Sequence, residues 1–216
     1  MLKINRIYCG DCLRVMQQIS SKSIDMVLTD IPYDQVTRPD HGLRNLNKAD
    51  ADILTFNLNI FMDALIRITK GSIYICCGWG QMSFILDKLI ASKLSTRMII
   101  WQKSNPSPMN GQYIWLSGVE PIAYGKFSGA TFNAHCRNTV LKYPSGRSKI
   151  HPTQKNLALF EDLIQVSSNE GDLILDPCLG SGTTAIAAMR LKRNFIGIEL
   201  NMEYCKIANE RLRGEL

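Results

Sequence analysis

The segment from residue 172 to residue 184, Asp-Leu-Ile-Leu-Asp-Pro-Cys-Leu-Gly-Ser-Gly-Thr-Thr, limits the possible folds of this chain more than any other. An apolar run ends in an acid, and a glycine-rich turn leads directly into a helix-forming stretch. This order is typical of α/β proteins that bind a nucleoside-bearing ligand, because glycine lets the backbone of the turn approach the ligand closely. Residues 25–33, Asp-Met-Val-Leu-Thr-Asp-Ile-Pro-Tyr, also resemble a strand that ends in an acid. We therefore expect two functional strand ends at one edge of a single sheet.

Short apolar runs alternate with longer amphipathic stretches along the whole chain. The 216 residues are enough for one domain, which we expect to span residues 1–216. The alternation predicts an α/β fold with a mostly parallel, seven-stranded sheet. The expected strands are Arg6–Cys9, Ser23–Thr29, Gly71–Cys77, Arg97–Gln102, Pro121–Gly125, Leu173–Leu175 and Asn194–Ile198. The expected helices are Cys12–Ile19, Leu54–Ile68, Gln81–Ser92, Asn156–Ser168, Thr183–Leu191 and Met202–Arg213, the last with Asn201 as its N-cap.

Hydropathy and cysteine content limit the class of protein further. No apolar run is long enough to span a membrane, and the N-terminus lacks the apolar run of a signal peptide, so we expect a cytoplasmic protein. Seven cysteines is an odd number that fits no disulfide framework, and we expect Cys76 and Cys77 to be core thiols. Cys9 and Cys12 have the spacing of half a zinc site, but no second such pair follows, so we expect no metal site.

Positive charge collects in two polar stretches that show no clear helix or strand pattern. The formal net charge of +6 fits a polyanionic partner, although solvated loop charge explains any one of these residues equally well. Residues 34–52 follow the second strand end directly, and residues 127–150 contain Gly and Pro among the basic residues. Long irregular connections inside a compact domain are usually functional or mobile. The basic residues that we assign to a partner surface are Arg38, Arg44, Lys48, Lys126, Arg137, Lys142, Arg147 and Lys149.

The glycine turn predicts a particular cofactor. Asp176 precedes the turn at residues 180–182, and Glu199 ends the next strand, where an acid typically accepts hydrogen bonds from ribose hydroxyls. A dinucleotide site would need Gly-x-Gly-x-x-Gly, and a P-loop would need a lysine after its second glycine; both are missing. An acid before the turn is unfavourable beside a pyrophosphate and favourable beside an ammonium group. The pattern therefore indicates S-adenosylmethionine, and a structural turn without a ligand is the alternative.

Residues 30–33, Asp-Ile-Pro-Tyr, provide the groups that methylation of an exocyclic amine requires. Such a nitrogen is a poor nucleophile because its lone pair is delocalised into the ring. The carboxylate of Asp30 and the carbonyl of Ile31 would accept its two N–H bonds, and Tyr33 after Pro32 would stack on the base. Positioning would then supply most of the catalysis. The alternative is a strand-end turn with a surface acid.

At these residues the chain resembles the DNA amino-methyltransferases, which make N6-methyladenine or N4-methylcytosine, over nearly its whole length. Residues 30–33 are similar to the family's catalytic Asp-Pro-Pro-Tyr, and residues 176–184 to its cofactor motif, Asp-Pro-Phe-x-Gly-Ser-Gly-Thr-Thr. Residues 151–155 (His-Pro-Thr-Gln-Lys), 10–12 (Gly-Asp-Cys) and 101–103 (Trp-Gln-Lys) are similar to three further family segments. The resemblance implies a Rossmann-like S-adenosylmethionine-dependent methyltransferase fold with helices on both faces of the sheet. It implies cofactor contacts from Asp11, Cys12, Asp30, His151, Thr153, Lys155, Asp176, Pro177, Cys178, Gly180, Ser181, Gly182, Thr183, Glu199 and Leu200.

The order of the motifs adds to the resemblance. The catalytic motif precedes the cofactor motif, which is the circularly permuted arrangement of the beta class. Protein-glutamine and ribosomal-RNA methyltransferases with a related motif have the opposite order, so the order favours DNA. The resemblance implies transfer of a methyl group to the N6 amine of adenine in double-stranded DNA, with the base flipped out of the helix. Residues 34–52 and 127–150 are then candidate DNA-recognition loops.

Several alternatives stay open. Family members that act on the N4 amine of cytosine more often have Ser in place of the catalytic Asp, so Asp30 favours adenine. A non-catalytic DNA-binding subunit with a methyltransferase fold is an alternative of another class, against which the intact cofactor motif argues. The small size resembles phage- or prophage-borne solitary methyltransferases. We expect a monomer or homodimer, with or without a cognate restriction endonuclease.

The chain departs from the family pattern at three positions. Ile31 replaces the first proline of the catalytic motif, which removes one fixed φ angle, and lower activity is one expected consequence. Cys178 replaces a phenylalanine that usually packs near the cofactor, so we expect a looser pocket. Asn156 replaces a proline at the start of a helix, which we expect to be a mild change.

Overall fold

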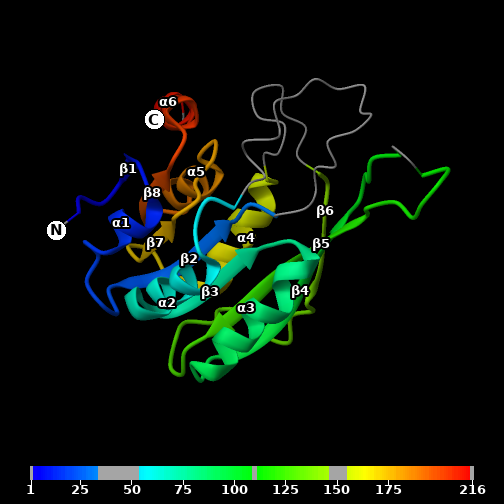
Figure 1. Ribbon diagram of the computed structural model, residues 1–216, viewed down its shortest axis with the longest axis horizontal. Helices are drawn as coiled ribbons and strands as arrows, with labels where there is room; N and C mark the ends of the chain where they lie inside the picture. The colour runs from blue at the N-terminus through cyan, green and yellow to red at the C-terminus, as the bar shows by residue number, and fades with distance from the viewer. Residues whose placement is uncertain (1, 34–53, 109–110, 146–154, 215–216) are drawn as a thin grey trace.

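The computed structural model describes residues 2–33, 54–108, 111–145 and 155–214, which form one mixed sheet between two layers of helices (Figure 1). Within these residues, no helix is long and apolar enough to cross a membrane. The strands are β1 (Arg6–Cys9), β2 (Ile24–Asp30), β3 (Thr69–Cys76), β4 (Ser95–Lys103), β5 (Val119–Lys126), β6 (Val140–Tyr143), β7 (Leu173–Asp176) and β8 (Asn194–Glu199). The helices are α1 (Cys12–Met16), α2 (Leu58–Ile68), α3 (Trp79–Ala91), α4 (Leu157–Ser167), α5 (Thr183–Arg190) and α6 (Met202–Arg213).

The sheet has the strand order β1-β8-β7-β2-β3-β5-β4-β6. Strand β5 runs antiparallel to β3 and β4, and the other neighbouring pairs are parallel. The predicted number of seven strands is wrong for the described residues, because Val140–Tyr143 adds an eighth strand beside β4. This strand lies inside the stretch 127–150 that we expected to be irregular. It escapes prediction because it is four residues long and buries one apolar side chain well, that of Leu141.

Each face of the sheet is covered by three helices, so the prediction of helices on both faces is confirmed. Side chains of α4, α5 and α6 form one hydrophobic cluster with Met26, Tyr74 and Trp101 of the sheet. Side chains of α1, α2 and α3 form the second cluster with Val27 and Ile73. Consecutive residues of β2 thus alternate between two fully buried faces, as expected for a central parallel strand.

Helix boundaries follow side-chain caps more than hydrophobic periodicity. Asn201 caps α6 as predicted, since its side chain accepts the amide N–H groups of Glu203 and Tyr204. Asn57 caps α2 in the same way, which is why the helix begins at Leu58 and not at Leu54. Asn156 caps α4, so asparagine at this position supplies an acceptor that proline lacks.

The chain connections place a topological switch point between β2 and β7. From β7 the chain passes through α5 to β8 on one side, and from β2 it passes through α2 to β3 on the other. In open α/β sheets, ligands bind at such a switch point, outside the carboxyl ends of the strands. Both acids that end the two diagnostic sequence segments lie at this edge.

Candidate active site

The two predicted strand ends lie side by side. Strands β2 and β7 are parallel neighbours, with Val27 level with Leu175. The hydroxyl of Thr29 donates a 2.8 Å hydrogen bond to Oδ1 of Asp176, so the last turns of the two strands are tied together. Asp30 is the next residue after Thr29. A group bound at the Asp30 end and a group bound at the glycine turn would therefore be neighbours.

The segment after β2 is held by the backbone and by one glutamine. The amide of Ile31 donates to the carbonyl of Cys76 (3.1 Å), and the Ile31 side chain is 2% exposed. Nε2 of Gln81 donates to the carbonyl of Pro32 (2.9 Å), and Oε1 of the same glutamine accepts the amide of Gly78 (2.8 Å). The start of α3 and the catalytic segment thus form one braced unit.

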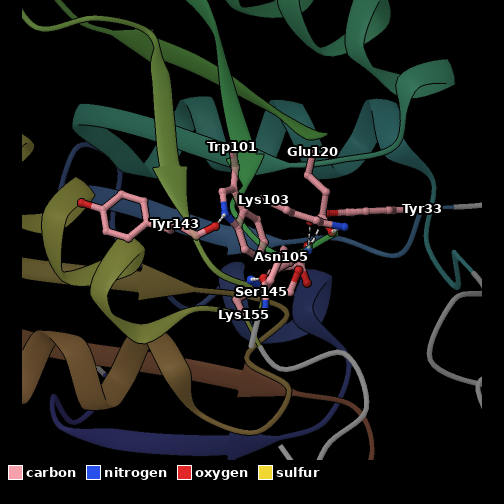
Figure 2. A network of polar contacts seen from close by, with 9 residues as sticks. Tyr33, Trp101, Lys103, Asn105, Glu120, Tyr143, Ser145 and Lys155 are labelled. Carbon is pink, nitrogen blue, oxygen red and sulfur yellow. Dashed lines mark hydrogen bonds and ion pairs between the residues drawn. The ribbon is translucent and has the colours of Figure 1, made fainter. Parts of the chain in front are cut away.

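A group of charged side chains lies at the hydroxyl end of Tyr33 (Figure 2). The ammonium of Lys155 donates to the Tyr33 hydroxyl (2.6 Å) and to Oε2 of Glu120 (2.6 Å). The same ammonium lies 3.1 Å from Oδ1 of Asp30. On the far side, Lys103 forms an ion pair of 2.7 Å with Oε1 of Glu120. Two carboxylates and two ammonium groups therefore alternate from Asp30 to Lys103, and β2, β4, β5 and the segment before α4 each contribute one of them.

The surroundings give the two carboxyl groups different pKa values. Burial raises the pKa of Asp30 to about 6, with a further increase from Glu120, while the Lys155 ammonium opposes the increase. Burial also disfavours ionisation of Glu120, but the ammonium groups of Lys155 and Lys103 hold its pKa at about 2. For Lys155, burial acts against the charge, and Asp30 and Glu120 overcome it and raise the pKa of the lysine. Near neutral pH, Glu120 is thus an anion, Lys155 is a cation and Asp30 is mostly ionised.

One oxygen of Asp30 is buried without a hydrogen bond. Oδ1 has no hydrogen-bond partner among the described residues, although the Lys155 ammonium lies within ion-pair distance. A buried carboxylate oxygen normally accepts one or more hydrogen bonds. The Asp30 side chain is still 27% exposed, so part of the carboxyl group faces solvent.

The acid before the glycine turn is bound within the protein. Asp176 is 3% exposed and accepts hydrogen bonds from the hydroxyls of Thr29 (2.8 Å) and Thr184 (2.5 Å) and from the amide of Cys178 (3.0 Å). Burial raises its pKa to about 7. These bonds join β2, the turn and the first residues of α5. The predicted contact between Asp176 and the ammonium of a cofactor stays a prediction.

The turn itself uses left-handed backbone. Gly180 has φ +55° and Gly182 has φ +90°, a region that favours glycine. Oε2 of Glu199 accepts the amide of Gly180 (2.7 Å), and its Oε1 accepts the amide of Asn201 (2.7 Å). Burial raises the pKa of Glu199. The acid predicted to accept ribose hydroxyls therefore also fixes the glycine turn.

The predicted cofactor loops border open space. A Cβ atom built on Gly10 or Gly180 would meet no protein atom within 4 Å, so a ligand can approach both backbones. Asp11 caps α1 by accepting the amide N–H groups of the two residues after Cys12. Cys178 packs against the hydrophobic cluster that contains Cys12, which joins the β1 loop to the glycine turn. The cysteine at position 178 thus has a packing partner where the family has phenylalanine.

Comparison with known proteins agrees with the site. Residues 114–210 match the family model described as DNA methylase. The chain is 30% identical over 236 residues to Type II methyltransferase M2.MboI from Moraxella bovis, covering 95% of this chain and 86% of the relative. This chain belongs to the DNA methylase family. Type II methyltransferase M.HpaI from Haemophilus parainfluenzae is 29% identical over 97% of this chain and 74% of its own length.

The solved structures similar to this DNA methylase include the M1.HpyAVI–SAM complex. It has a TM-score of 0.74 and 28% sequence identity, covering 96% of this chain and 98% of that one. The predictions of a DNA amino-methyltransferase and of a Rossmann-like fold are therefore confirmed. The circular permutation and the phage-like origin stay predictions.

The structure of this DNA methylase brings most of the predicted site residues to one edge. Asp30, Ile31, Pro32, Tyr33 and Lys155 lie together, as described above. The predicted cofactor residues of β1, β7 and β8 lie at or after the carboxyl ends of these parallel strands: Asp11, Cys12, Asp176, Pro177, Cys178, Gly180, Ser181, Gly182, Thr183, Glu199 and Leu200. His151, Thr153, Arg38, Arg44, Lys48, Arg147 and Lys149 lie outside the described residues.

The described basic residues in and beside the second predicted recognition loop, Lys126, Arg137 and Lys142, differ in their surroundings. Lys126 of β5 lies level with Ser72 of β3, whereas Asp30 lies level with Cys76 of the same strand. Four residues of strand, or about 13 Å, separate these two levels, so Lys126 lies toward the amino ends of the parallel strands. Arg137 forms an ion pair with Asp162 of α4, so its charge has a partner within the protein. Lys142 is exposed on β6. Lys126 lies away from the catalytic edge, because β5 runs antiparallel to β3 and carries its C-terminal end away from that edge.

Two features of this edge escaped sequence reasoning. Glu120 lies in a strand with little charge, and its ion pairs with Lys103 and Lys155 are visible only in the structure. In the sequence, the Trp-Gln-Lys segment that contains Lys103 was the only indication of this charged group. The connection from β4 to β5 carries exposed apolar side chains, with Tyr113 82% and Trp115 95% exposed. Figure 1 shows this connection projecting from the sheet.

Proposed function

We propose that this DNA methylase transfers a methyl group from S-adenosylmethionine to the N6 amine of adenine in double-stranded DNA. The observation that carries the proposal is the placement of Asp30 beside Asp176, the acid that precedes the glycine turn, across the β2–β7 switch point. A methyl donor at the turn and an amine at Asp30 would be neighbours there.

The residues at the edge fit the proposed cofactor. A Cβ atom at Gly10 or Gly180 would meet nothing within 4 Å, so a nucleoside would have access to both backbones, and Asp11 and Glu199 would supply acceptors for it. We assign the exposed side chain of Leu200 to the same nucleoside. When bound, S-adenosylmethionine supplies an electrophilic methyl group, and the protein fixes the position of the acceptor amine.

The catalytic segment would hold the amine by its N–H bonds. Asp30 and the carbonyl of Ile31 accept these bonds, and Tyr33 stacks on the base. The adenine amine lies inside the duplex, so the base must be extruded before it can reach Asp30. The exposed rings of Tyr113 and Trp115 project near this edge, and aromatic rings of this kind stack on bases or enter base steps.

One assay tests the proposal. Incubation with tritiated S-adenosylmethionine and unmethylated double-stranded DNA, followed by nucleoside analysis, should yield N6-methyladenine. N4-methylcytosine would instead support the cytosine alternative, and DNA binding without any transfer would support a non-catalytic subunit. Asp30→Ala should abolish transfer and change cofactor affinity only a few fold; an equal loss of cofactor binding would contradict the role of Asp30.

The partners and location of this DNA methylase remain part of the proposal. Double-stranded DNA is the proposed macromolecular substrate, and the cytoplasm is its proposed location. A monomer or homodimer, acting with or without a restriction endonuclease, fits the proposal equally.

A further inference from the structure

Lys155 has three N–H donors, and its two shortest hydrogen bonds go to groups other than Asp30. Its donors are directed to the Tyr33 hydroxyl and to Oε2 of Glu120, both at 2.6 Å. The distance to Oδ1 of Asp30 is 3.1 Å, and this oxygen has no hydrogen-bond partner among the described residues. Lys155 is thus near enough to stabilise the charge of Asp30 while its shortest bonds go elsewhere, and the exposed part of the carboxyl group faces solvent.

The other groups around Asp30 are anionic or become anionic when they lose a proton. Glu120, Tyr33, Cys76 and Asp176 all interact with Asp30, and Cys77 follows Cys76 in the same strand end. Lys103 lies beyond Glu120, to which it is paired. Within the described residues, Lys155 is therefore the cation in contact with Asp30.

Glu120 determines where Lys155 sits. It accepts a hydrogen bond from Lys155 on one oxygen and pairs with Lys103 on the other, so it is itself held from two sides. Its side chain is 18% exposed and that of Lys155 is 10% exposed, so solvent screens their attraction only weakly. Without the charge of Glu120, the nearest anion for Lys155 is Asp30.

We propose that Glu120 is a positioning residue that keeps Lys155 beside Asp30 with its shortest hydrogen bonds elsewhere, so that Asp30 is charged and its exposed oxygen is free to accept an N–H of the target amine. This inference rests on the proposed function, because the amine is the group that would use the free acceptor. It assigns Glu120 and Lys155 to the methyl-transfer site in addition to the Asp-Ile-Pro-Tyr segment. Tyr33 is oriented by the same lysine.

The first test measures the protonation of Asp30 in the protein alone. The carboxyl carbon of Asp30 is followed by ¹³C NMR against pH in the native chain, in Lys155→Met and in Glu120→Gln. Lys155→Met should move the Asp30 titration to higher pH by about one pH unit or more, because a nearby cation is lost. Glu120→Gln should move it to lower pH, because an anion is lost and Lys155 turns to Asp30. Shifts in the same direction, or no shifts, would overturn the proposal.

The second test measures methyl transfer. Glu120→Gln should lower kcat/KM at least about tenfold across the pH range, because Lys155 then occupies the Asp30 acceptor. Lys155→Met should move the acidic limb of the kcat/KM profile to higher pH. Above that limb it should retain more activity than Glu120→Gln. Adding Lys155→Met to Glu120→Gln should recover activity at alkaline pH. A double variant no more active than Glu120→Gln would contradict the proposal.

Two further variants separate positioning from folding. Glu120→Asp keeps the charge and should restore most of the activity, whereas Lys70→Met removes a lysine paired with Asp25 at the opposite end of the sheet and should leave the pH profile unchanged. Urea unfolding of each variant establishes that it is folded. If Glu120→Gln is unfolded, the native chain is instead compared with Glu120→Asp and with the double variant Glu120→Gln/Lys155→Met, in which one negative and one positive charge are both removed. If the native chain transfers no methyl group, the proposed function fails, and the NMR titration still tests the position of Lys155.

Discussion

Gly78 leaves no room for a side chain, and this gives a sharp test of how tightly the catalytic segment must be held. A Cβ atom at position 78 would lie 2.9 Å from the carbonyl oxygen of Tyr33 and 3.3 Å from its Cβ. Gly78 has φ −72° and ψ 158°, which alanine adopts freely, so Gly78→Ala acts through this contact and not through backbone strain. Relief to an ordinary separation of about 3.4 Å needs a shift of about 0.5 Å.

A displacement of 1 Å at an active site costs about 100-fold in rate, so we expect Gly78→Ala to lower kcat about tenfold. The free energy of unfolding should fall by about 1–2 kcal/mol, since alanine is also a poorer N-cap than glycine. Gly80→Ala is the matched control, because its Cβ would meet nothing within 4 Å. Tritium transfer to DNA at saturating cofactor measures the rate, and urea unfolding measures the stability. Gly78→Ala activity within twofold of the native chain, or an equal loss in Gly80→Ala, would refute the reasoning.

Three further predictions concern the cofactor, pH and salt. Glu199→Ala should weaken S-adenosylmethionine binding about 10–100-fold in calorimetry, because the amide of Gly180 loses its charged partner, and a purely catalytic defect would contradict this. Native kcat/KM should fall about tenfold per pH unit below about pH 6, since burial raises the pKa of Asp30 and only its carboxylate accepts an N–H; a limb near pH 4 would argue against it. DNA affinity should fall steeply as the salt concentration rises. Lys142→Ala should reduce the slope of log affinity against log salt concentration by about one, whereas Lys126→Ala should leave it unchanged. Equal effects of the two substitutions would contradict DNA binding at the catalytic edge.

Much of the fold could be predicted because its signals are local. Each apolar run that we expected to be a strand is part of one, and the acid at the end of each diagnostic segment lies at the predicted sheet edge. The eighth strand could not be predicted in the same way. Residues 140–143 form a strand because β4 offers an unpaired edge and because Nε1 of Trp101 donates to the carbonyl of Tyr143. Such pairing depends on a partner about 40 residues away.

The site was predictable only as far as its motifs reach. Asp30 and the glycine turn carry strong sequence patterns, but the position of Lys155 beside Asp30 does not follow from its own motif, which implied a cofactor contact. Glu120 belongs to no sequence motif, and its place in the site results from the pairing of β4 with β5, which brings it beside Lys103. Charge networks join residues from distant elements, so sequence spacing does not encode them.

Hydrogen bonding and packing hold Ile31 in the catalytic segment. Proline at this position would fix φ, but it has no amide N–H. Ile31 uses its amide to bond the carbonyl of Cys76, which extends the pairing of β2 with β3 by one residue, and its side chain is buried among α2, α3 and the sheet. A hydrogen bond and buried apolar surface thus replace a covalent restraint. The expected loosening of the segment is therefore offset by packing, so lower activity does not follow from Ile31 alone.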